Sequence, residues 1–305
     1  MATPALFDPI MFDDAAIIAK RNLLAKQDCP PNRLQAEIAL RLNERIDEVK
    51  RSFNQRLIYG YRPEDQPLLD HNIAAKLSII EPAPALAALA ATRNPNATIL
   101  NTPILNTPMS AGLKDIALAP QTHDLILSNL LLHWVNDLPE LLRQFHNILI
   151  PDGLLLASAI GGTSLSALRQ ALLQAESDLS PKVHPRIIPM LDIKDLGGLA
   201  MSANFTLPMV DKDVIRMEFR NFYDALKSLK RMGENNMLSS RQRGCAPKAL
   251  FAGAAYYFEQ LTGQAPDQPL IFEFEILFLT AWRADHSQPK ALTPGAATHD
   301  LKDFL

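Results

Sequence analysis

Between residues 123 and 158 the spacing of apolar side chains changes twice. Residues 124–128 form a short run of Leu and Ile, residues 138–149 repeat apolar side chains every three to four positions, and residues 154–157 are apolar throughout. The outer patterns predict strands buried on both faces, and the middle one predicts an amphipathic helix. Pro151-Asp152-Gly153 predicts the turn between this helix and the second strand. Buried strands joined by a helix are typical of a parallel sheet.

Similar patterns extend over most of the chain. An amphipathic helix is predicted at 34–49, further strands at 56–61, 75–80, 97–100, 205–217 and 270–282, and further helices at 219–232 and 246–261. This order predicts an α/β fold with a Rossmann-like, doubly wound, seven-stranded sheet whose last strand is inserted antiparallel. The sheet is expected to have a helical insertion before the last strand and an N-terminal helical arm.

The expected division of the chain has three parts. Residues 1–31 form the N-terminal arm, with a short basic helix that carries Lys20, Arg21 and Lys26. Residues 32–285 form the sheet domain, with a helical cap at about 219–262, and residues 286–305 form an extended tail. The tandem repeat ILNTPILNTP at 99–108 is interpreted as a duplication in a surface loop, because proline at every fifth position excludes a regular helix or central strand.

Composition narrows the function further. The formal net charge of −3 gives no basic face for a nucleic-acid backbone, and the 2 cysteines cannot make a disulfide framework. No stretch approaches the roughly 18 apolar residues of a transmembrane helix, and the acidic start of the chain resembles neither a secretory nor a transit peptide. A cytoplasmic location is therefore expected. The 7 histidines show no metal-binding spacing, so no metal site is expected.

Ligands of doubly wound sheets bind beyond the carboxyl ends of the strands. Glu81 closes the second predicted strand at a spacing from Gly60 that suits a carboxylate binding ribose hydroxyls. A solvent-facing glutamate at a strand end is the alternative. The turn after the first strand contains one glycine, Gly60, and by itself does not make a nucleotide-binding loop.

The fourth strand leads into a second candidate region. Ser128 and Asn129 end this strand, and His133 and Trp134 follow at the mouth of the expected site. The indole of Trp134 can stack on an adenine or line a substrate pocket. Equally, it can be a core aromatic that covers the end of the sheet.

Several segments carry a resemblance to a known family. They are SNLLLHWVNDLP within 124–176, PRIIPMLDIKDLGGLAMSANF at 185–205, SLKRMGENNM at 228–237, the early RLNERIDEVKRSF and the late AWRADHSQPKALTPGAATHDL. The chain resembles class I S-adenosylmethionine-dependent methyltransferases, in the branch of the mitochondrial complex I assembly factor 5, an arginine hydroxylase, and its alphaproteobacterial relatives. The malonyl-carrier-protein methyltransferases of biotin synthesis are a more distant likeness.

The resemblance implies a cofactor, a site and a partner. The cofactor is S-adenosylmethionine and the partner is a respiratory complex I subunit or another protein substrate, to be methylated or hydroxylated on arginine. The implied cofactor-binding residues are Tyr59, Gly60, Glu81, Asp115, Ser128, Asn129 and Leu130, and the implied substrate pocket contains His133, Trp134 and Asn236.

Two residues depart from the family pattern. Ile58 stands where the family has an acid, and Arg62 stands where it has a second glycine. A large cation near the site of a sulfonium is electrostatically unfavourable. The chain is therefore either an enzyme of this family or a cofactor-defective relative that serves as a non-catalytic assembly or binding module. The Arg231–Asn236 segment either caps the substrate side or is a helix C-cap at Gly233 followed by a polar loop.

Overall fold

The computed structural model describes residues 10–26, 32–71, 75–100, 118–264 and 268–288. Asp115, most of the tandem repeat and nearly all of the expected tail lie outside these residues. Their predicted roles therefore stay predictions.

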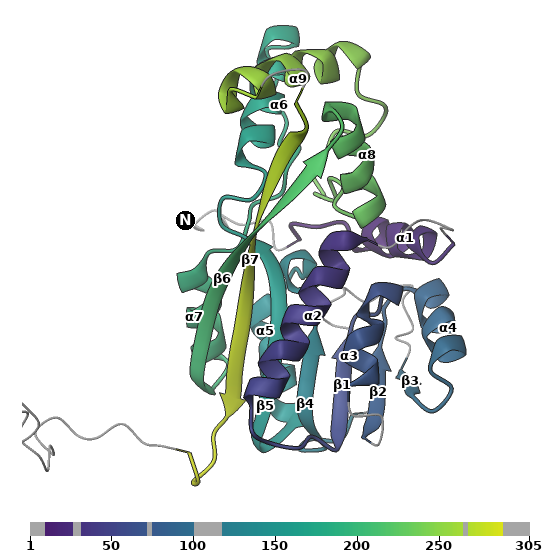
Figure 1. The fold of residues 1–305 in the computed structure, drawn as a ribbon, viewed down its shortest axis with the longest axis vertical. Helices are drawn as coiled ribbons and strands as arrows, with labels where there is room; N and C mark the ends of the chain where they lie inside the picture. The colour runs from purple at the N-terminus through teal and green to yellow at the C-terminus, as the bar shows by residue number, and fades with distance from the viewer. Residues whose placement is uncertain (1–9, 27–31, 72–74, 101–117, 265–267, 289–305) are drawn as a thin grey trace, which may run out of the picture.

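A seven-stranded mixed sheet forms the centre of the fold (Figure 1), which confirms the predicted class. Its strands are β1 (Gln55–Tyr59), β2 (Lys76–Ile80), β3 (Thr98–Leu100), β4 (His123–Ser128), β5 (Leu149–Gly161), β6 (Phe205–Phe219) and β7 (Leu270–Arg283). They lie in the order β3-β2-β1-β4-β5-β7-β6. The pairs among β1 to β5 are parallel, and β7 is antiparallel to both β5 and β6. The last strand is thus inserted antiparallel, as the sequence predicts.

The predicted turn at Pro151-Asp152-Gly153 is wrong. These residues belong to β5, which starts directly after the helix that precedes it. The ladder between β4 and β5 shifts register between His123 and Leu125, and Asp152 has a positive φ of 61°. The turn-forming residues are therefore accommodated as an irregularity of the strand rather than as a break between helix and strand.

Helices cover both faces of the sheet (Figure 1). They are α1 (Asp14–Leu24), α2 (Arg33–Glu48), α3 (Gln66–Asp70), α4 (Pro84–Arg93), α5 (Leu138–Ile148), α6 (Ser166–Leu179), α7 (Ile193–Ser202), α8 (Phe222–Met232) and α9 (Lys248–Thr262), with short 3-10 turns η1 (Pro63–Asp65) and η3 (Leu132–Trp134). The predicted spacing holds in α2, where Leu34, Ile38, Leu42 and Ile46 are all buried. Side chains of Asn32, Asp137 and Asn221 accept backbone N–H bonds at the starts of α2, α5 and α8.

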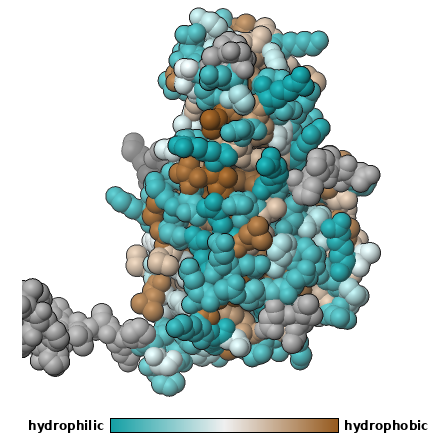
Figure 2. Space-filling view, viewed as in Figure 1, coloured by the Kyte–Doolittle hydropathy of each residue, from teal (hydrophilic) through white to brown (hydrophobic). Residues whose placement is uncertain are grey.

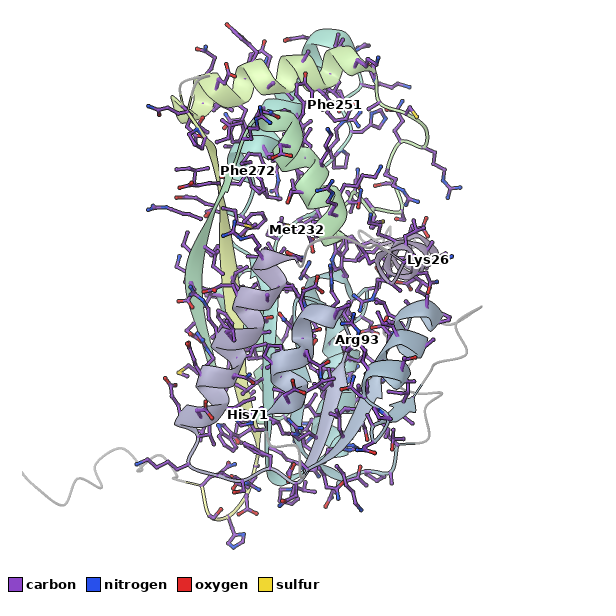
Figure 3. All side chains as sticks on the ribbon, turned by 45° about the vertical axis from the view of Figure 1, so that its right-hand side comes forward. Lys26, His71, Arg93, Met232, Phe251 and Phe272 are labelled. Carbon is purple, nitrogen blue, oxygen red and sulfur yellow. The ribbon has the colours of Figure 1, made fainter. Side chains whose placement is uncertain are left out.

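Strands β6 and β7 extend beyond the rest of the sheet and carry α6, α8 and α9 at their far end (Figure 1). The aromatic rings of Phe222, Phe258 and Phe272 meet there, with centroid distances of 5.7 Å and 4.9 Å along the series. Helix α8 ends at Met232, close to the end of α1 near Lys26 (Figure 3). This junction lies at the end of the sheet where ligands of such folds bind.

Candidate functional site

Glu81, which follows β2, is completely buried and bound by the chain itself. Arg21 of α1 donates from Nε to Oε1 at 3.0 Å and from Nη2 to Oε2 at 2.6 Å. The backbone N–H groups of Tyr61 and Ala83 donate to the same carboxylate at 2.6 Å and 2.8 Å. Arg21 also donates to the carbonyl oxygen of Tyr61 at 3.2 Å. Both carboxylate oxygens therefore have two donors each, all from the protein.

This pair changes the interpretation of Glu81. The carboxylate predicted to accept ribose hydroxyls is occupied by a guanidinium in bidentate geometry, which is among the strongest charge-assisted arrangements. Burial opposes the charge on Arg21, but Glu81 outweighs that effect and holds the pKa of Arg21 above its ordinary value. The alternative of a solvent-facing glutamate is wrong, because no part of Glu81 is exposed.

The turn after β1 is closed on its inner side. Gly60 has φ of 83°, a conformation that favours glycine, and a Cβ added there would lie 2.5 Å from Leu131 Cδ2. Ile58 is buried in the core, and Tyr59 packs edge-on against Phe145 with ring centroids 5.3 Å apart. Burial and the neighbouring Glu81 raise the pKa of the Tyr59 hydroxyl. The side chain of Leu131 therefore occupies the space beside Gly60, where glycines of such turns let a ligand approach the backbone.

Arg62 is buried and ties this turn to α8. Its Nη1 donates to the carbonyl oxygen of Met232, and its Nε lies 3.6 Å from Glu64 Oε2 without a hydrogen-bond partner. Burial lowers the pKa of Arg62, while Glu64 acts in the opposite direction. The cation that the sequence marks as a departure is thus a cross-link between the β1 turn and the end of α8.

A buried polar network lies behind this turn. Asp65 Oδ1 accepts from Gln35 Nε2 at 2.9 Å and from Asn129 Nδ2 at 2.8 Å, and Oδ2 accepts from the Arg62 N–H at 2.8 Å. Asn129 Oδ1 in turn accepts from Ser158 Oγ at 3.0 Å. Burial raises the pKa of Asp65 to about 6 against these three donors, which lower it. Asn129, predicted to lie beside the cofactor, is engaged inside the protein.

Of the other predicted site residues, Leu130 and Trp134 line the cavity described below, whereas Ser128, His133 and Asn236 do not. Ser128 is fully buried and its Oγ has no hydrogen-bond partner. His133 accepts from the Ile160 N–H at 3.3 Å and lies 3.4 Å from Glu234. Trp134 is 6% exposed and packs edge-on against Phe12 at 5.4 Å, as a core aromatic does. Asn236 bonds to the Pro185 carbonyl at 2.9 Å and to the Leu238 N–H at 3.1 Å.

A small cavity remains where α1, the β1 turn and the end of α8 meet. Its volume is about 20 Å³. Its lining comprises Ile17, Lys20, Arg21, Leu24, Arg62, Leu130, Trp134, Met232, Gly233, Glu234 and Met237. This volume admits one or two water-sized groups, far less than ligand pockets of roughly 300 Å³ or more. In this conformation the residues do not fit S-adenosylmethionine.

A wider hollow of about 400 Å³ opens elsewhere, between α6 and residues 184–189. Arg169 and Arg186 are the cations of its lining, His184 is a further polar group, and Leu172, Leu173 and Ile187 are apolar. Arg186 is paired with Glu176 at 2.7 Å. None of the predicted site residues lines this hollow.

Three residues of the site were not predicted: Arg21, Asp65 and Gln35. Sequence reasoning places Arg21 only in a basic helix of the arm, and Asp65 comes two positions after the unusual Arg62-Pro63. The one sequence signal for this polar network is Arg62, which stands in place of the family's second glycine, because a large cation at that turn needs space and polar partners nearby. Among the described residues, no group of three or more His, Cys, Asp or Glu could hold a metal ion. No helix within those residues is long and apolar enough to cross a membrane.

Comparison with known proteins links the chain to one family. The methyltransferase domain family matches residues 66–157, so the matched region begins after the altered β1 turn. The arginine hydroxylase NDUFAF5 of Danio rerio is 30% identical over 89% of this chain and 81% of its own length. The malonyl-[acyl-carrier protein] O-methyltransferase of Gallionella capsiferriformans is 26% identical over 87% of this chain and 88% of its own length.

The prediction of a cytoplasmic location is contradicted by this comparison. The Danio rerio relative, like those of Dictyostelium discoideum, Mus musculus and Homo sapiens, is named a mitochondrial protein. An acidic N-terminal segment and a low cysteine count were therefore insufficient grounds for assigning a compartment.

Solved structures support the fold. A putative methyltransferase from Bacillus halodurans superposes with a TM-score of 0.53 at 10% identity, covering 80% of this chain and 99% of its own. Together with the identity to NDUFAF5 over most of both chains, this likeness confirms the predicted family. The protein has the fold of S-adenosylmethionine-dependent methyltransferases and is homologous to NDUFAF5. The chain belongs to the class I methyltransferase family, in the branch of the arginine hydroxylase NDUFAF5.

Proposed function

We propose that this chain is a non-catalytic assembly or binding module built on a methyltransferase fold, with its cofactor site closed by α1. The observation that carries the proposal is the buried Arg21–Glu81 pair. The ribose-binding acid of the family is saturated by protein donors, and about 20 Å³ of free space remains beside it. S-adenosylmethionine is the cofactor that family membership predicts, and we infer that the chain does not hold it while α1 is docked.

The proposed partner is a protein, and a respiratory complex I subunit is the first candidate. This choice is supported by homology to NDUFAF5, which also supports the competing function of methylating or hydroxylating an arginine. The competing function has one structural observation in its favour, which is that Glu81 is retained at the end of β2. A retained acid without access for its ligand supports a fold inherited from an enzyme better than a working site.

Calorimetry with S-adenosylmethionine tests the closed site directly. We expect the full chain to show no binding tighter than roughly 100 µM, which corresponds to about −5.5 kcal/mol. The same titration of Arg21→Ala shows whether the guanidinium alone closes the site. Micromolar binding by the unmodified chain would refute the proposal.

Mass spectrometry tests the absence of catalysis independently of cofactor affinity. Complex I subunits are compared between cells that contain and cells that lack the protein, with the assembled complex quantified on native gels. We expect less assembled complex without the protein but no change in arginine methylation or hydroxylation of its subunits. Loss of such a modification would instead establish the enzymatic function.

A further inference from the structure

The carboxyl-terminal halves of α1 and α8 form a cationic surface, which we call the α1–α8 face. It comprises Lys20 and Lys26 from the end of α1 and Lys227, Lys230 and Arg231 from the end of α8. No carboxylate occurs at 20–26 or at 226–232, although the chain as a whole has a net charge of −3. Within the described part of the chain, none of these five side chains makes an ion pair. The surface over α8 is largely hydrophilic in Figure 2, and the ends of the two helices lie close together in Figure 3.

The cations of this face repel one another. Burial lowers the pKa of Lys20, and the charges of Lys230 and Arg62 lower it further. Lys20 is half-buried, so the solvent screens this repulsion incompletely. An anion bound between these groups would relieve the repulsion.

The 20 Å³ cavity adjoins this face through Lys20, which lines it together with Arg62. The side chain of Arg62 is nine-tenths buried, and its Nε makes no hydrogen bond, although it forms an ion pair with Glu64 Oε2 at 3.6 Å. An unsatisfied buried donor of a charged group is costly and needs an explanation. One carboxylate oxygen is about the size of the free space, whereas a nucleoside is far larger. Glu234 lines the same cavity, where its charge opposes the lowering of the Arg62 pKa, and its Oε2 lies 3.4 Å from His133 Nε2.

We propose that the α1–α8 face binds an acidic segment of a partner protein, with one Asp or Glu side chain seated in the cavity lined by Lys20 and Arg62. The proposal rests on the proposed function as a binding module and names the chemistry of its partner. A recessed cation is reached by a single side chain more easily than by a flat layer of lipid head groups. The carboxylate would lie against α1, so binding would also hold the closing helix in place.

The test is fluorescence anisotropy with a labelled decaglutamate peptide, with decaglutamine as the uncharged control. We expect decaglutamate to bind, decaglutamine not to bind, and the affinity to fall as salt is raised. The Lys20→Ala variant should bind about 3- to 10-fold more weakly. Lys26→Ala removes a cation from the same face but outside the cavity lining. Its fold-loss of decaglutamate affinity should be less than half that of Lys20→Ala.

A second control removes cations from another part of the surface. Lys182 and Lys194 are exposed and lie in other segments, so the double alanine variant at these positions should bind decaglutamate as the unmodified chain does. Equal losses in Lys20→Ala and Lys26→Ala would overturn the seated carboxylate. Loss in the Lys182 and Lys194 variant equal to that in Lys20→Ala would overturn the face itself. Lys20-dependent binding to phosphatidylserine vesicles without binding to decaglutamate would replace the acidic protein with a membrane surface.

All titrations are repeated with saturating S-adenosylmethionine. If the cofactor binds and decaglutamate binding still depends on Lys20, the closed-site function fails while the acidic-segment proposal survives. If the cofactor does not bind and decaglutamate does not bind either, only the acidic-segment proposal fails. Each exposed or half-exposed lysine is replaced without disturbing the core, and circular dichroism confirms that the variants are folded.

Discussion

Replacing Arg21 by alanine tests the physical basis of the closed site. The substitution removes two charge-assisted bonds to Glu81, at 3.0 Å and 2.6 Å, and one bond to the Tyr61 carbonyl oxygen. Glu81 keeps its bonds from the N–H groups of Tyr61 and Ala83 but loses its counter-charge. A fully buried carboxylate is then left without a cation.

The magnitude follows from this geometry. Hydrogen bonds to charged groups contribute about 1.5–3 kcal/mol each, so two of them account for roughly 3–6 kcal/mol. Removing one partner of a buried pair costs about 3–5 kcal/mol in other proteins, in agreement with this range. Because Glu81 retains two backbone donors, we expect a loss of about 3–4 kcal/mol of unfolding free energy. For a chain of this length that corresponds to a Tm lower by roughly 5 °C.

The assay is urea unfolding followed by circular dichroism, with two comparison variants. Arg216→Ala breaks an ion pair between side chains that are 71% and 58% exposed, and should change the unfolding free energy by less than about 1 kcal/mol. The double variant Arg21→Met, Glu81→Gln removes both charges and should be more stable than Arg21→Ala. If Arg21→Ala lowers the unfolding free energy by no more than Arg216→Ala does, the Arg21–Glu81 pair does not hold α1 in place and the reasoning is wrong.

Two further predictions concern the turn after β1. Gly60→Ala should lower the unfolding free energy by more than the roughly 1 kcal/mol that a positive φ alone costs, because the new Cβ meets Leu131. The measurement is urea unfolding. Gly263→Ala is the matched control, because Gly263 has φ of 65° and nothing lies within 4 Å of its added Cβ. Asp65 has a pKa of about 6 in the fold against 3.8 for the unfolded chain, so its protonated form stabilises the fold at low pH. We expect this contribution to the unfolding free energy, about 3 kcal/mol, to be lost as the pH rises from about 4 through 6. Asp65→Asn should lack this part of the pH dependence, and an equal dependence in both proteins would contradict the assignment.

Local pattern was sufficient for most of the secondary structure. The runs of Leu and Ile in β4 and β5 and the spacing of Leu141, Leu142 and Phe145 in α5 identified a buried strand, helix and strand, because side-chain periodicity directly reflects which face is buried. The turn at Pro151-Asp152-Gly153 was misjudged for the opposite reason. Turn propensity is a local preference, and pairing with β4 outweighed it.

Local sequence patterns predicted the candidate site only in part. Glu81 and Asn129 were correctly expected at the ends of β2 and β4, because topology places the carboxyl ends of parallel strands together. Their partners were not predictable, since Arg21 lies 60 residues from Glu81 and Gln35 lies 94 residues from Asn129. No local pattern states which surface cation folds back onto which buried acid.

The sequence by itself determined the class of fold, the family and the departure of the β1 turn from the family pattern, because each depends on the order of residues within short segments. Only the tertiary structure decided what that departure means. Packing of α1 over the end of β2 placed Arg21 on Glu81, and the link from Arg62 to α8 closed the remaining space to about 20 Å³. Whether a strand-end carboxylate is free to bind a ligand depends on whether the fold places a guanidinium against it, and that is a property of long-range packing.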